Sequence, residues 1–283
     1  MGLYVNTNIN SMIAQRSLTS ATSGMQSAIK RLSTGLRVNQ AGDDAAGLCV
    51  AQGLETQIRG NKRAMLNIQD GLNMMYIAEG GMSGVTEDLQ RIRELCLQAA
   101  NGVYSEDQQG TLFNEVNERI KDIDVIANTT IFNGMQLANG EAAKVKDIIL
   151  QSGCGTVEAD NTINITSALT DMNVSSLGVE STLDGTSTNE EIRAYIDKLD
   201  AAINTIAVNR SKLGAFQNRL QSASDNLTIM NENYSQSKSQ IMDADMAEES
   251  ANMVKYQVLQ QTSAAMLSQA NQIPSIAMTL LQG

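Results

Sequence analysis

Residues 191–241 read EIRAYIDKLDAAINTIAVNRSKLGAFQNRLQSASDNLTIMNENYSQSKSQI, without a proline. A continuous helix over this span measures about 75 Å, at about 1.5 Å per residue. An apolar or aromatic side chain recurs at a seven-residue interval, which keeps one seam of a helix against a partner helix. The stretch therefore predicts half of a coiled-coil rod, and the seam comprises Ile192, Leu199, Ile206, Leu213, Leu220, Leu227, Tyr234 and Ile241.

A second column with the same period supplies the partner helix. It consists of Leu54, Ile68, Met75, Met82, Leu89 and Cys96, and is interrupted only at Asn61. We expect one helix over residues 45–100, although Gly80 and Gly81 each cost about 1 kcal/mol relative to alanine. The apolar register is the same on both sides of these glycines, which favours a continuous helix.

The middle of the chain has a different character. A helix with apolar residues at mixed three- and four-residue spacings starts at Ser105. Phe132-Asn133-Gly134 is a turn signal, and residues 148–151, 157–158 and 162–166 are typical of short strands. The fold class predicted is mainly α: a long antiparallel coiled-coil helical rod with a small β-hairpin-containing insertion.

Both ends of the chain carry shorter amphipathic helices. One covers residues 12–34, and the other follows a joint at residues 242–245. Isolated helices with so few salt-bridging charges are marginal in water, so we infer that other chains complete them. Their predicted core-packing residues are Leu18, Met25, Leu32, Leu259, Met266, Ile273 and Leu280.

The expected division is a first terminal helix in 1–42, the first half of the rod in 43–128 and a β-containing region in 129–188. The second half of the rod follows in 189–242, and the second terminal helix in 243–283.

Composition argues against an enzyme. Aromatic residues make up only 3% of the chain, and histidine, the commonest general base and metal ligand, is absent. The three cysteines, Cys49, Cys96 and Cys154, are too far apart for a zinc-ribbon spacing. We therefore predict no catalytic, cofactor-binding or metal-binding residue.

Charge is distributed unevenly. The net charge is −11, yet residues 1–42 and 250–283 contain no Asp or Glu. Nucleic acid selects basic surfaces, so it is not an expected partner. No apolar run approaches the roughly 20 residues that span a bilayer, so no membrane partner is expected either.

Several motifs, in order along the chain, resemble bacterial flagellin. They are RLSTGLRVN at 31–39, DDAAG at 43–47, QRIREL at 90–95, FNG at 132–134, LGAFQNR at 213–219, IMDAD at 241–245 and SQANQ at 268–272. The resemblance covers residues 1–140 and 189–283, nearly everything outside the β-containing insertion.

This resemblance implies a structural subunit that polymerises into the bacterial flagellar filament for motility. Its terminal helices would form the inner core of a helical tube, surrounded by the rods. It also implies export through the flagellar secretion channel, with an export chaperone, a filament cap and hook-junction proteins as partners. The resulting filament would be external or periplasmic. The short connection at 179–189 leaves no room for an outer domain.

The resemblance further implies an inter-subunit contact surface. Many flagellins present the same surface to a host Toll-like receptor. The residues that match it are Gln90, Arg91, Glu94, Leu95, Gln98 and Glu115. From helical spacing alone, this set is also consistent with an ordinary solvated helix face, so both interpretations remain open.

Two other functions compete with that of a filament subunit. A hook–filament junction protein has similar terminal helices but usually a larger outer region. A membrane-interacting secreted translocator would use the acid-free ends as amphipathic helices on lipid.

Overall fold

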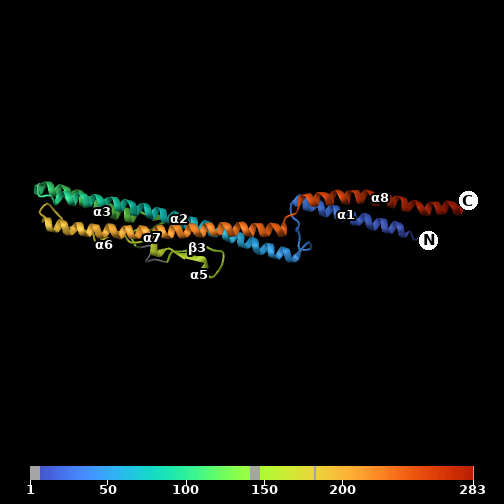
Figure 1. Ribbon diagram of the computed structural model, residues 1–283, viewed down its shortest axis with the longest axis horizontal. Helices are drawn as coiled ribbons and strands as arrows, with labels where there is room; N and C mark the ends of the chain where they lie inside the picture. The colour runs from blue at the N-terminus through green and yellow to red at the C-terminus, as the bar shows by residue number, and fades with distance from the viewer. Residues whose placement is uncertain (1–6, 141–146, 182, 283) are drawn as a thin grey trace. The chain divides into compact units, whose positions relative to one another are not determined.

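The computed structural model describes the backbone of residues 7–140, 147–181 and 183–282, with side chains up to residue 272 (Figure 1). The chain divides into two compact units. One consists of Met1–Thr56 with Glu232–Gly283, and the other is Gln57–Asn231.

Two long helices, α2 and α7, form the predicted rod. Helix α2 is Ala45–Ala99, 55 residues without a break at its glycines, and α7 is Asn189–Met242, 54 residues. They run antiparallel, because Arg93 pairs with Asp200 at 2.6 Å whereas Gln217 donates to Glu79 at 3.0 Å.

Most of the predicted seam of α7 lies in the second unit. Its side chains are buried from one end of that unit to the other, at Ile192, Leu199, Ile206, Leu213, Leu220 and Leu227. Tyr234 and Ile241, which belong to the first unit, are half-buried. The rod seam is therefore most completely buried where further elements of the second unit pack on it.

One of these elements is α3, Glu106–Thr129. Ser105 starts it with a capping box, in which its hydroxyl accepts from the Gln108 amide and the Gln108 side chain accepts from the Ser105 amide. Phe113, Val116 and other α3 side chains join the core made by α2 and α7. Three helices thus share one apolar interior.

The insertion holds two small antiparallel hairpins. In the first, β1 (Ile131–Phe132) pairs with β2 (Met135–Gln136), and Asn133 takes a left-handed φ of 48° at the predicted turn. In the second, β3 (Ile149–Gln151) pairs with β4 (Thr162–Asn164).

The strand predicted at residues 157–158 is wrong. Val157 instead precedes a single helical turn, α5 (Glu158–Asn161). The Asn161 side chain donates to the Val157 carbonyl and accepts from the Gly155 amide, and these bonds satisfy the loop without a strand partner. Two further short helices follow in the insertion, η1 (Thr166–Ala168) and α6 (Val174–Leu177).

Glycines on α2 let the second hairpin lie directly on the helix. A Cβ at Gly60 would fall 2.6 Å from the Cβ of Cys154, and one at Gly71 would collide with Leu150. The hairpin therefore depends on the absence of side chains at these two positions.

Asn61 is a polar side chain inside the α2–α7 seam. It is 0% exposed, and neither its Oδ1 nor its Nδ2 atom has a hydrogen-bond partner. Leaving a buried polar group unsatisfied costs about 1–3 kcal/mol. Asn61, which interrupts the apolar column of α2, therefore lowers the stability of the rod.

Replacing Asn61 with leucine should raise the free energy of unfolding of the rod by about 1–3 kcal/mol, because it removes two unsatisfied atoms and adds apolar burial. Thermal unfolding followed by circular dichroism measures this. Asn67→Leu is the matched control, because Asn67 is half-buried rather than fully buried and its side-chain amide donates to the Gln151 carbonyl at 3.2 Å. A lower melting temperature for Asn61→Leu than for wild type would contradict the assignment.

Candidate assembly interface

The two terminal helices form an antiparallel pair. Helix α1 is Ile9–Thr34 and α8 is Met246–Gln282, and they lie side by side in Figure 1. Gln260 donates to Thr22 at 3.2 Å, and Ser11 donates to Asn271 at 2.8 Å. These bonds set the register between α1 and α8.

Small residues on α1 make this contact. Ala14, Ala21 and Ala28 are its buried side chains. A Cβ at Gly24 would lie 2.5–2.8 Å from ring atoms of Tyr256, so the aromatic ring rests on bare backbone. The shared surface is a narrow strip, and it leaves most of the larger apolar side chains uncovered.

The predicted core-packing residues border this strip. Leu18, Met25 and Leu32 are half-buried, whereas Leu259 and Met266 are 42% and 60% exposed. The side chains of Ile273 and Leu280 lie outside the described residues. A role in packing against other copies remains a prediction for the whole set.

Two hollows open along one flank of the pair. The first, of about 350 Å³, lies between Ile13 and Ala14 on α1 and Leu259 and Met266 on α8. The second, of about 450 Å³, is lined by Arg16 and Tyr256, and shares Leu259 with the first. This flank offers an apolar groove at the molecular surface.

The chain passes between terminal helices and rod through a hydrogen-bonded joint. Gly35 ends α1 with a left-handed φ of 70°. The Arg37 amide donates to the Met242 carbonyl at 2.7 Å, and the Ala244 amide donates to the Gly35 carbonyl at 2.9 Å. The predicted joint at 242–245 falls where α7 ends, at Met242, and α8 begins, at Met246.

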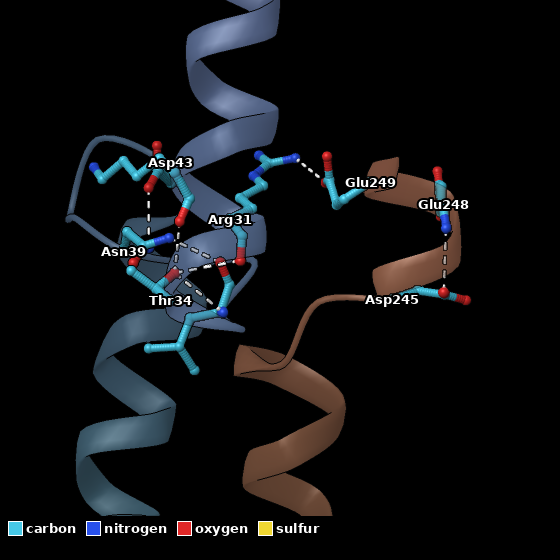
Figure 2. A network of polar contacts seen from close by, with 9 residues as sticks. Arg31, Thr34, Asn39, Asp43, Asp245, Glu248 and Glu249 are labelled. Atoms are coloured by element: carbon cyan, nitrogen blue, oxygen red, sulfur yellow. Dashed lines mark hydrogen bonds and ion pairs between the residues drawn. The ribbon is translucent and has the colours of Figure 1, made fainter. Parts of the chain in front are cut away.

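Side chains reinforce this joint (Figure 2). Asp43 accepts from the Asn39 amide at 3.0 Å, and this bond holds the pKa of the carboxyl below its ordinary value. Asp245 accepts from the Glu248 amide at the start of α8. Arg31 reaches from α1 to Glu249 at 2.8 Å.

The Arg31–Glu249 pair was not anticipated from the sequence. Glu249 is 8% exposed, and its partner is one of only four basic residues in the acid-free first 42 residues. That scarcity of charge was the available signal, since an acid that borders an acid-free segment has few basic residues to pair with there.

The predicted contact surface on α2 is mostly exposed. Gln90, Arg91, Glu94 and Gln98 face solvent. Arg91 binds Glu94 at 3.2 Å and Glu115 of α3 at 3.3 Å, and these carboxylates raise the pKa of its guanidinium. The set therefore forms one polar patch across two helices.

Leu95 is the exception. It was expected at the edge of this surface but is 1% exposed, inside the core. Since both α3 and α7 pack on α2 here, the buried arc of α2 is wider than a single heptad seam and includes Leu95 together with Leu89, Ile92 and Cys96. Leu95 supports the patch from beneath.

The cysteines do not form a site. Cys49 and Cys154 are exposed, whereas Cys96 is buried, which raises its pKa to about 12. Among the residues that the structure describes, no three Cys, Asp or Glu side chains converge as metal ligands would. Within the same residues, no helix is long and apolar enough to cross a bilayer.

Replacing Arg31 with methionine should loosen the terminal pair, because Glu249 would keep a buried charge without a partner. At a cost of about 1–3 kcal/mol, trypsin should cut after Arg16 roughly ten times faster in dilute protein, since cleavage follows the opened population. The double variant Arg31→Met, Glu249→Leu should return to within about twofold of wild type. Unchanged cleavage in the single variant would show that the ion pair does not hold the helices together.

Comparisons with known proteins show the family of this chain. Residues 5–143 match the family described as bacterial flagellin N-terminal helical region, and residues 196–281 match bacterial flagellin C-terminal helical region. The flagellar filament 33 kDa core protein of Treponema phagedenis is 36% identical, over 99% of this chain and all of that one. The flagellin of Bacillus subtilis strain 168 is 35% identical with the same coverage.

A solved flagellin structure, from Bacillus cereus, is 28% identical and covers 57% of this chain and 88% of that chain, with a TM-score of 0.49. The two family matches and the near-complete coverage of the relatives leave little of the chain unaccounted for. The chain belongs to the bacterial flagellin family and is a structural subunit of the flagellar filament.

Proposed function

We propose that this subunit polymerises through its paired terminal helices, α1 and α8. The observation that carries the proposal is the uncovered apolar surface of that pair. Exposed large side chains occur along both helices, at Ile9, Met12, Ile13, Ile29, Met246, Val254, Val258, Leu259 and Met266. A soluble monomer rarely exposes apolar surface on this scale without a partner for it.

The rod has a supporting role in this proposal. Its seam is closed by α3 and by the second hairpin, so it needs no other chain to complete its core. It would surround the polymerised terminal helices, with the Arg91 patch as a lateral contact between neighbouring rods. Many flagellins present this patch to a Toll-like receptor, and we extend that partner to this chain through Gln90, Arg91, Glu94, Gln98 and Glu115.

The remaining parts of the proposal follow from family membership. The subunit is exported to the flagellum, where the filament is external or periplasmic. An export chaperone would cover the C-terminal segment before assembly, and the cap and hook-junction proteins would contact the ends of the filament. The subunit acts as a structural element without a reaction of its own. A hook–filament junction role is disfavoured by the small insertion, and a membrane translocator by full-length similarity to filament proteins.

Adding the full-length protein to short filament seeds should elongate them, as seen by negative-stain electron microscopy. A variant that lacks residues 1–42 and 243–283 should stay soluble and leave seed length unchanged, because it has lost the apolar surface. Elongation by this shortened variant would contradict the proposal.

Arg91→Glu should slow elongation, because it places a third carboxylate beside Glu94 and Glu115 and reverses the charge offered to a neighbour. Lys121→Glu on α3 is the control, since Lys121 is exposed and pairs only with Glu118 in the described chain. Both variants should unfold at temperatures near that of wild type. If Arg91→Glu and Lys121→Glu elongate seeds at equal rates, the patch has no role in lateral contact.

A further inference from the structure

A cleft of about 330 Å³ lies between the second hairpin and α7, and we call it the hairpin cleft. Cys154 and Ile163 line it on the hairpin side, and α7 lines it from Arg219 to Met230. These two α7 residues are 11 positions apart. The cleft therefore extends about 16 Å along the helix, at about 1.5 Å per residue. Its length and small volume fit an extended chain better than a compact molecule.

Asn61 stands in the wall of this cleft. It is 0% exposed, and both polar atoms of its side chain lack a hydrogen-bond partner among the described residues. An asparagine side chain offers an acceptor oxygen and an NH₂ donor group. A peptide group presents the complementary N–H and C=O, so the backbone of a bound peptide would satisfy both atoms of Asn61.

The hairpin also offers a strand edge at the cleft. Within the described residues, β4 pairs with β3 alone, and Thr162 and Ile163 of β4 line the cleft. Strand β3 lies against α2, where Leu150 rests on Gly71, so β4 is the strand nearer α7. A strand edge without a partner carries free backbone groups, and an extended peptide can add to it as a further strand.

Charged groups of opposite sign stand toward the two ends of the cleft. Gln217 bonds to Glu79, so Arg219 lies toward that level of α2, whereas the loop that contains Asp160 rests at Gly60. Arg219 and Asp160 are exposed and make no ion pair or hydrogen bond with any described residue. A carboxylate bound at Arg219 would gain a charge-assisted hydrogen bond.

The α7 wall favours a peptide over water as the occupant. Ala223, Leu227 and Met230 give this wall an apolar surface. On the hairpin side, the Asn161 and Thr162 side chains already bond to backbone carbonyls of the loop. Water held in the cleft would find few polar partners, whereas the methyl groups of a peptide would cover the apolar wall.

We propose that the hairpin cleft binds a short extended peptide that carries a free carboxylate. The carboxylate binds Arg219, a backbone peptide group binds Asn61, and an ammonium group lies near Asp160. Five extended residues span about 16 Å, at about 3.3 Å each, which matches the length of the cleft. The bound peptide joins the second hairpin to α7 and removes the cost of the unsatisfied amide. The site uses no residue of the terminal helices, so its test is independent of polymerisation.

Thiol protection tests whether the cleft is occupied. Cys154 lines the cleft and is exposed, and Cys49, exposed in the other unit, is an internal control. Penta-alanine with free termini, added to the dilute full-length subunit, should slow modification of Cys154 by methyl methanethiosulfonate and leave Cys49 unaffected, as measured by mass spectrometry. With peptide at about nine times its Kd, the rate at Cys154 should fall about tenfold. An unchanged rate at Cys154 overturns the inference.

Calorimetric titration tests the role of Arg219. Arg219→Gln should weaken penta-alanine binding about tenfold or more, because it removes a charge-assisted bond. Lys212→Gln is the matched control, since Lys212 is exposed on α7 and does not line the cleft. It should bind as wild type does. Amidating the carboxyl end of the peptide should weaken binding to wild type but cause no further loss in Arg219→Gln. An equal loss in both proteins places the carboxylate elsewhere and overturns the inference.

The same titration with Asn61→Leu tests the amide. This variant should bind penta-alanine about tenfold or more weakly than wild type, because it cannot bond to the peptide backbone. Its free form should nevertheless melt at a higher temperature than wild type, so loss of folding cannot account for weaker binding. Affinity equal to that of wild type shows that the amide does not contact the peptide, and overturns the inference.

Discussion

The narrowness of the contact between α1 and α8 is the constraint on which the rest depends. Three alanines and a glycine bring the helices close together, and this closeness leaves the larger apolar side chains at the margins. A helix pair that buries mainly alanine gains little, since burial stabilises by about 25 cal/mol per Å² of apolar surface. The small residues that let α1 and α8 pack closely therefore also leave the larger apolar side chains of both helices uncovered.

The rod is built on the opposite principle. Its seam buries isoleucine, leucine and methionine side chains completely, and α3 covers the side that α2 and α7 leave open. Glycines at positions 60 and 71 let the second hairpin lie flat on α2 and close the structure further. One chain thus combines a self-sufficient unit with a unit whose stability depends on neighbours, as a filament subunit requires.

The heptad periodicity of the long helices made the rod and its joint to the terminal helices predictable from the sequence. The heptad column that begins at Ile192 predicted the rod, and the end of this column after Ile241 predicted the joint. What could not be predicted depends on contacts between elements. The burial of Leu95 follows from two helices packing on α2 at one level, and the helical turn after Val157 follows from bonds made by Asn161.

Hydrogen exchange of backbone amides, compared between free subunit and filament, tests the central claim most directly. In the free subunit, amides of α1 and α8 should exchange rapidly while those of α2, α3 and α7 in residues 57–231 are protected; assembly should protect the terminal helices strongly and change the rod little. Equal protection of α1 and α8 in the dilute monomer and the filament would contradict the account.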